Sequence, residues 1–141
     1  MRFLAVIITG LSLIAPAAHL FVLANKIGLP KTEYFIVQQI YRGWWIVGLL
    51  LPMAFLANVG NAIAQRDDRV AVILSIAAAA LIALNLIIFM LFTQPANAAT
   101  QNWTVQPENW EALRFQWEYS HAVNAGVTFL AFCCAALAST R

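Results

Sequence analysis

The chain has 141 residues, of which 62% are hydrophobic and only 10% are charged, and its formal net charge is +2. So few charged side chains cannot cover the surface of a water-soluble domain. The absence of a basic cluster excludes a nucleic-acid partner of the usual kind. At ~20 residues per bilayer crossing, four crossings use about 80 of the roughly 87 apolar residues. The composition therefore predicts an all-α, polytopic membrane protein in which one four-helix domain occupies residues 1–141.

Four apolar runs are long enough to cross a bilayer. They cover residues 3–24, 43–64, 70–92 and 119–138. Only five residues, from Gln65 to Arg69, separate the second run from the third. So short a connection predicts a tight hairpin, which makes these two helices antiparallel neighbours. Both termini are then expected on the same side of the membrane.

The first run has two interpretations. Met1-Arg2, followed by apolar residues up to Ala15-Pro16-Ala17, also fits a cleavable secretory signal. The apolar run continues past these small residues to Ala24, which gives it the length of a membrane span. We therefore expect a retained helix with a kink at Pro16.

The third connection, residues 93–114, is the longest and most polar of the chain. Its second half resembles a helix start, with a proline at 107 and acidic residues at 108 and 111. The fourth helix is therefore expected to begin near Pro107 and to run for about 30 residues, or about 45 Å. That length exceeds the hydrocarbon core of a bilayer.

The orientation rests on the basic residues, which divide equally between the two predicted sides. Arg42 and Arg114 lie beside tryptophans at helix starts, where they can face the bundle. They would then not count among the basic residues of the loops. Setting them aside places the termini in the cytoplasm, in a bacterial inner (plasma) membrane. All five tryptophans then fall on the outer side, where interfacial anchoring explains part of the pattern.

Polar residues inside spans are costly and are therefore candidate functional residues. A stripe of them follows one face of the fourth helix at steps of four and three: Trp110, Arg114, Trp117, His121, Asn124 and Thr128. Arg114 can reach Glu111 or Glu118 at helical spacing, and a solvated face is the alternative for Glu111. We expect Arg114 to point into the bundle and to pair with Glu118, the deeper of the two acids.

The first helix has a matching stripe, Thr9, Ser12, Pro16 and His19. His19 and His121, the only histidines, differ in expected depth by only ~3 Å. Arg42 and Asn85 approach the same level. The sequence therefore predicts that the two histidines face each other across one cavity.

Two other groups receive structural interpretations. Asn58 and Asn61 lie in the other half of the bundle and are expected to hydrogen-bond between helices. Cys133 and Cys134 are adjacent, a spacing that suits neither a redox pair nor a zinc site, so we interpret them as small apolar packing residues. No metal site is predicted.

Residues 92–122 resemble a signature of the anthrone oxygenase-like family of small four-helix membrane proteins. The resemblance rests on Pro95-Ala96-Asn97 after the third helix, and on Trp110, Arg114, Trp117 and His121 entering the fourth. It covers the architecture of the whole chain but the motif of this stretch only. The amino-terminal half, with Ala18-His19-Leu20 and Tyr41-Arg42-Gly43, departs from the family's common pattern.

This resemblance implies oxidation of an anthrone-like, polycyclic aromatic substrate by O2 without an established cofactor. Asn97, Trp110, Arg114, Trp117 and His121 carry over from the family pattern. The polar positions of the predicted spans themselves, and not the resemblance, indicate further candidates. These are the catalytic candidates His19, Arg42 and Glu118, and the substrate-binding candidates Asn85 and Asn124.

In the expected mechanism a histidine, whose ordinary pKa is about 6.5, removes a proton from the substrate. Arg114 or Arg42 stabilises the enolate oxygen, while Trp110 and Trp117 stack on the substrate in a dry pocket. The expected partners are an apolar small molecule, O2 and the lipid bilayer.

Two alternatives remain from sequence. Histidines at one depth on different helices can be the axial ligands of a b-type haem, which an absorption spectrum would reveal. The chain can also be a non-catalytic membrane subunit or a small-molecule binder. The sequence does not indicate the cofactor or the oligomeric state.

Overall fold

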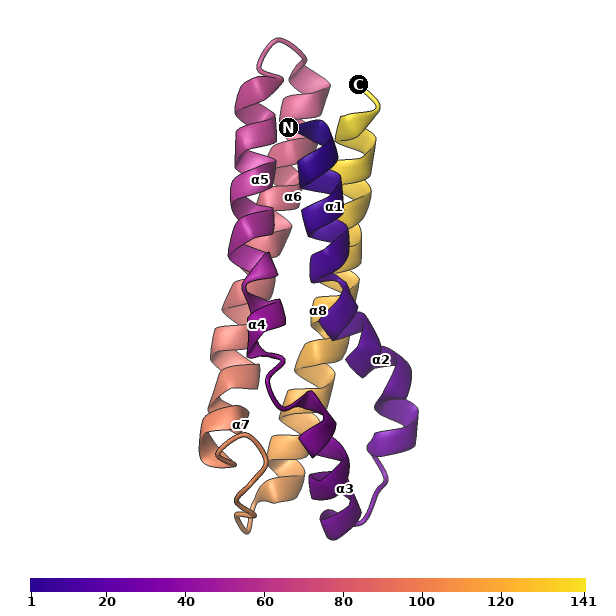
Figure 1. Cartoon of the computed structure of the whole chain (residues 1–141), viewed down its shortest axis with the longest axis vertical. Coiled ribbons are helices and arrows are strands. Elements are labelled where there is room, and N and C mark those ends of the chain that lie inside the picture. The colour runs from indigo at the N-terminus through magenta and orange to yellow at the C-terminus, as the bar shows by residue number, and fades with distance from the viewer.

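The computed structural model describes all residues, 1–141, and consists of helices without a strand. Four helical segments are long and apolar enough to cross a membrane. They are Arg2–Lys26, Trp45–Ala64, Arg69–Ala99 and Trp110–Ser139. The segments lie side by side in an elongated bundle, and both chain ends lie at the same end of it (Figure 1).

The first span is broken where the sequence predicts a kink. A single residue separates helix α1 (Arg2–Ser12) from helix α2 (Ile14–Lys26), and Pro16 occupies the first turn of α2. Proline cannot donate to the carbonyl four residues earlier and clashes with it, so the break falls just upstream of Pro16. After the break α2 leans away from α4 and α5 (Figure 1).

The second span and the segment before it are more fragmented than predicted. They contain α3 (Lys31–Gln38), a 3-10 turn (η1, Gln39–Tyr41), α4 (Trp45–Gly48) and α5 (Leu50–Ala64). The chain turns at Gly43, whose φ of 87° favours a residue without a Cβ atom. The expected continuous helix from residue 43 is therefore wrong over its first turns.

The third and fourth spans extend beyond their predicted bounds. Helix α6 (Arg69–Ile88) passes through a π-helical turn (η2, Phe89–Thr93) into α7 (Gln94–Ala99). Pro95 removes one backbone hydrogen bond there, which explains the widened turn just before it. Helix α8 (Trp110–Ser139) begins three residues after Pro107 and has the predicted 30 residues. The loop predicted over 93–114 is thus reduced to residues 100–109.

Small side chains and buried amides hold the bundle together. Asn58 donates to Thr9 Oγ1 at 2.8 Å and Asn61 donates to Ser75 Oγ at 2.9 Å, which confirms their interhelical role. Nearer the other end, Asn85 of α6 donates to Thr128 Oγ1 of α8 at 2.6 Å. Fully buried alanines allow the helix backbones to approach closely: Ala54, Ala71, Ala78, Ala131 and Ala135.

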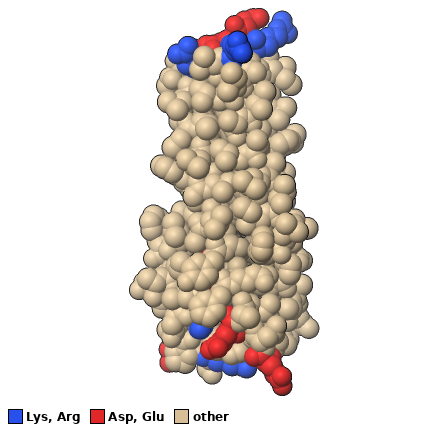
Figure 2. Space-filling model, turned by 180° about the vertical axis from the view of Figure 1, so that it is seen from behind, with Lys and Arg blue, Asp and Glu red and all other residues tan.

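Charged side chains on the surface gather at the two ends of the bundle, and the surface between them is uncharged (Figure 2). The end that holds the termini carries Arg2, Arg66, Arg69 and Arg141, all exposed. At the opposite end, Lys26 and Arg114 are buried.

Candidate functional site

A cavity of about 1030 Å³ lies in the half of the bundle opposite the termini. Its wall comes from α2, α8, α3 and the residues that follow it, the end of α6, α7 and the loop after α7. The volume is at the upper end of the range typical of small-molecule sites, about 300–1,000 Å³. Seven of the ten predicted site residues line it: His19, Arg42, Asn85, Asn97, Trp117, His121 and Asn124.

The rim of the cavity has two parts, identified by lining residues that are exposed. One part is largely apolar and includes Trp45 and Gly48. The other is polar and includes Arg42, Gln101 and Asn102. A molecule in the cavity therefore borders both an apolar surface and a polar one.

The two histidines lie close together as predicted, but their rings touch within the cavity wall and do not face each other across the cavity. Their ring centroids are 4.1 Å apart, at an interplanar angle of 34°. Tyr41 lies 4.2 Å from His19, while Trp117 lies 4.7 Å from His19 and 4.4 Å from His121. Trp44 lies 6.0 Å from His19. Aromatic rings thus surround both imidazoles and exclude much of the water from them.

Four buried side chains of the cavity wall each hold a polar atom without a hydrogen-bond partner in the protein. They are His19 Nδ1, Gln38 Oε1, Trp103 Nε1 and Asn124 Oδ1. These side chains are all at most 4% exposed. A buried polar atom without a partner costs free energy, and native proteins contain few of them. Four of the eleven such atoms in the protein belong to side chains that line this cavity.

An unusual turn delivers Trp103 to the cavity. Gln101, Asn102 and Trp103 have φ values of 46°, 55° and 64°, in the left-handed region. Each such residue is strained by about 1–2 kcal/mol unless it is glycine, with asparagine less affected. The Trp103 carbonyl accepts a 2.9 Å bond from Gln39 Nε2, and its N–H donates to Thr100 Oγ1 at 3.1 Å. Backbone strain of this kind often accompanies functional sites.

Trp103 is among the site residues that the sequence did not predict, as are Lys26, Tyr34 and Tyr41. The sequence assigns Trp103 no role beyond its place on the outer side, where interfacial anchoring explains part of the tryptophans, yet it is only 4% exposed. Its neighbours Gln101 and Asn102 carry no glycine signal that would have predicted the turn.

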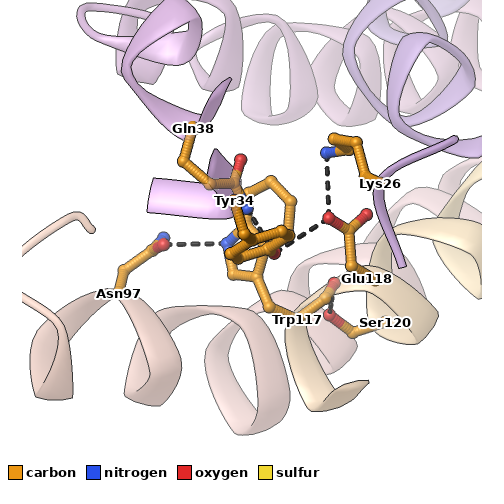
Figure 3. A network of polar contacts seen from close by, with 7 residues as sticks. All are labelled: Lys26, Tyr34, Gln38, Asn97, Trp117, Glu118 and Ser120. Carbon is orange, nitrogen blue, oxygen red and sulfur yellow. Dashed lines mark hydrogen bonds and ion pairs between the residues drawn. The ribbon is translucent and has the colours of Figure 1, made fainter. Parts of the chain in front are cut away.

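A buried charged network lies behind the aromatic wall (Figure 3). Lys26 Nζ is 2.9 Å from Glu118 Oε1, which also accepts a 2.9 Å hydrogen bond from the Tyr34 hydroxyl. Gln38 Nε2 donates to the same hydroxyl and links the network to the cavity wall. Burial and the Glu118 carboxylate raise the pKa of Tyr34 and of Tyr41, so both phenols are protonated at neutral pH.

The predicted pairing of Arg114 with Glu118 is wrong, because Lys26 holds that carboxylate. Arg114 Nη1 donates to the Leu29 carbonyl at 2.7 Å, and Nη2 is 4.0 Å from Glu111. Arg114 is buried as predicted, but it lies outside the cavity lining. Lys26, the last residue of α2, reaches Glu118 of α8, a long-range contact that helical spacing does not reveal.

Trp110 also lies away from the cavity. The Arg114 guanidinium stands 4.6 Å from the ring of Trp110, which packs against Tyr34 and Phe35. Glu118, behind the wall, does not line the cavity either. The stripe on α8 therefore divides into two parts. Its outer residues, Trp110 and Arg114, pack near α3, and its deeper residues, from Trp117 to Asn124, face the cavity.

The remaining predicted residues have defined partners. Asn97 Oδ1 accepts a 2.8 Å bond from Trp117 Nε1 and so fixes that ring against the histidines. Arg42 Nη2 donates to Gln39 Oε1 at 2.8 Å from the exposed rim. Asn85 and Asn124 lie deeper, on α6 and α8.

The arrangement of the histidines does not fit a bis-histidine haem. Axial nitrogens stand about 2 Å from the iron on opposite faces of the macrocycle, so the ring centres lie well over 4 Å apart. Here the two rings are in contact with each other. No cluster of three or more His, Cys, Asp or Glu side chains suited to a metal ion is present. The two cysteines are free and half-buried on α8.

No family model, curated protein or solved structure matches this chain. The site is therefore interpreted from its own geometry.

Proposed function

We propose that this chain is an integral membrane oxygenase that binds a flat, apolar small molecule in the cavity and oxidises it with O2. The observation that carries the proposal is the contact between His19 and His121 in the wall of a large, aromatic-lined cavity. The cavity volume of about 1030 Å³ supports a small-molecule ligand in the same place. The resemblance of residues 92–122 to anthrone oxygenase-like proteins supplies the reaction class.

The proposed location is a bacterial plasma membrane with cytoplasmic termini. The four apolar segments support insertion. The exposed basic residues support the orientation, because four of them are arginines at the terminal end. At the other end Lys26 and Arg114 are buried, so only Arg42 and the half-buried Lys31 remain. The positive-inside rule then favours the terminal end as the cytoplasmic one.

In the proposed reaction a histidine of the pair takes a proton from a methylene group flanked by a carbonyl-conjugated ring system. The Trp103 indole N–H has no partner in the protein, and in this proposal a rotation of the ring turns it into the cavity, where it donates to the enolate oxygen that develops. Trp103 takes the role expected of Arg114, which lies outside the cavity lining. Trp117 and Tyr41 provide the rings against which a flat substrate packs.

The carbanion transfers one electron to O2, and the two radicals combine to a carbon-bound hydroperoxide that recovers the proton. Loss of the second C–H proton and cleavage of the O–O bond leave a carbonyl group and one water molecule. The overall change is CH2 plus O2 to C=O plus H2O. The protein supplies a base, a hydrogen-bond donor and a site with little water.

The test is oxidation of anthrone by the purified protein in lipid nanodiscs, followed by quinone absorbance and O2 consumption. We expect a rate above that of protein-free nanodiscs, and a loss of about 10²–10⁴-fold for His19→Phe or His121→Phe, whichever is the base. Arg66→Gln, at the other end of the bundle, is the control and should be unchanged. Wild-type turnover no faster than the protein-free reaction, with anthrone nevertheless bound, would support the binding-only alternative instead.

A further inference from the structure

Arg42 is the one charged side chain, histidines aside, among the residues that line the cavity, and no aspartate or glutamate lines it. Its only polar side-chain contact is the neutral amide of Gln39. By contrast, Lys26 and Arg114 near this end each lie within 4.0 Å of a carboxylate. The cavity therefore has a cationic rim whose charge the protein does not neutralise.

The lining changes in character along the bundle. Toward the middle of the bundle it includes the apolar residues Pro16, Leu51 and Phe89, together with the amides of Asn85 and Asn124. At the end where α3 and α7 lie (Figure 1), it is rich in amides: Gln38, Gln39, Asn97, Gln101 and Asn102. An apolar, aromatic chamber with an amide-rich, cationic rim is complementary to an amphiphilic molecule rather than to a wholly apolar one.

We propose that the ligand of this cavity carries an acidic group, such as a carboxylate, which Arg42 binds at the rim while the flat apolar body packs against the histidine and tryptophan rings. This inference rests on the proposed function and names the substrate class of the same site. A guanidinium pairs with a carboxylate through two parallel hydrogen bonds, which an amide or a hydroxyl cannot match. Arg42 then acts in binding and orientation and does not touch the reacting carbon.

The experiment compares two probes of nearly equal shape, anthracene-9-carboxylate and anthracene-9-carboxamide. Binding is measured by quenching of tryptophan fluorescence, since Trp44, Trp103 and Trp117 line the cavity. Nanodiscs of zwitterionic phosphatidylcholine keep the lipid charge neutral. We expect the carboxylate to bind about tenfold more tightly than the amide, because hydrogen bonds to charged groups are worth about 1.5–3 kcal/mol and Arg42 is partly screened by water.

Arg42→Gln should abolish the preference for the carboxylate and leave the affinity for the carboxamide unchanged. Arg42→Lys should retain part of the preference, because it keeps the charge without the planar fork. Lys31→Gln removes a charge at the same end but outside the cavity lining, and should leave both affinities unchanged. Added salt should reduce the preference of the wild-type protein.

Equal affinities for the two probes in the wild-type protein, or a preference that survives in Arg42→Gln, would overturn this inference while leaving the proposed oxidation intact. Failure of both probes to bind the wild-type protein would overturn the binding site on which both proposals rest. If Arg42→Gln binds neither probe because it misfolds, the salt dependence of the wild type and the affinity of Arg42→Lys decide. A preference insensitive to salt and unchanged in Arg42→Lys contradicts the role of Arg42.

Discussion

At the scale of single residues, the buried pair Lys26–Glu118 carries the largest electrostatic consequence. Both side chains are at most 3% exposed, and Glu118 Oε2 has no hydrogen-bond partner. Removing one member of such a pair leaves an uncompensated buried charge, which is more destabilising than the loss of the pair itself. The stability of the fold near the cavity is therefore sensitive to replacement of either residue alone, but less sensitive to replacement of both by apolar residues.

Glu118→Gln should destabilise the protein by about 3–5 kcal/mol, because Lys26 remains buried without its counter-ion. The double variant Lys26→Met with Glu118→Met should recover most of the loss. Glu111→Gln should change stability by less than about 0.5 kcal/mol, since the Glu111 side chain is 66% exposed. Reversible unfolding in mild detergent measures all three. A double variant as unstable as Glu118→Gln would contradict the pairing.

Asp68, in the hairpin between α5 and α6, gives a pH prediction. Its carboxylate accepts bonds from the backbone N–H groups of Ala71 and Val70, at 3.0 and 2.9 Å. The bond from Ala71 lowers the pKa of Asp68 most, with smaller effects from Val70 and the charge of Arg141. Because the folded-state pKa is the lower one, the stabilisation is complete above the unfolded-state pKa and disappears as the pH falls below about 4.

Amide hydrogen exchange at Val70 and Ala71 measures this effect. Asp68→Asn is the reference, because asparagine caps the helix without titrating. Compared with this variant, the wild-type protein should lose protection of the two amides as the pH falls below about 4. Protection that follows the same pH course in both proteins would contradict a capping role for the ionised carboxylate.

At the scale of elements, the left-handed turn at 101–103 is the most testable feature. Gln101 has a φ of 46°, which glycine adopts without steric cost. Gln101→Gly should therefore raise the melting temperature, with a gain of roughly 0.5–1 kcal/mol. Val105→Gly, in the same loop but without a positive φ, should be neutral or destabilising. A fall in melting temperature for Gln101→Gly would show that the turn is not strained.

The elements also show what the sequence could predict. Long apolar runs predicted the four spans, because burial in lipid requires continuous apolar stretches. Helical spacing and depth predicted that His19 and His121 lie at one level of the same cavity, but not that their rings touch. The sequence did not predict the partner of Glu118, because Lys26 reaches it through the packing of α2 against α8, two helices far apart in the chain. Nor did it predict the position of Trp103, which depends on a backbone conformation that no local residue signals.

At the scale of the whole molecule, the arrangement of charges predicts a topology. With Cys133 and Cys134 replaced by alanine, single cysteines are introduced at Asp67 in the hairpin and at Gln106 in the loop before α8. A membrane-impermeant maleimide should label Gln106→Cys in intact cells, and Asp67→Cys only after permeabilisation. The opposite pattern would reverse the orientation. Labelling of both positions in intact cells would contradict the membrane crossing by Arg69–Ala99, the span that separates them.

The largely apolar part of the cavity rim, at Trp45 and Gly48, has a consequence for how affinity must be expressed. A ligand that arrives through this rim from the bilayer is concentrated there by partitioning and diffuses in two dimensions. Its occupancy of the cavity then follows its mole fraction in lipid rather than its concentration in the buffer. Diluting the protein with empty vesicles, at a fixed total amount of probe, should weaken apparent binding in proportion to the added lipid surface.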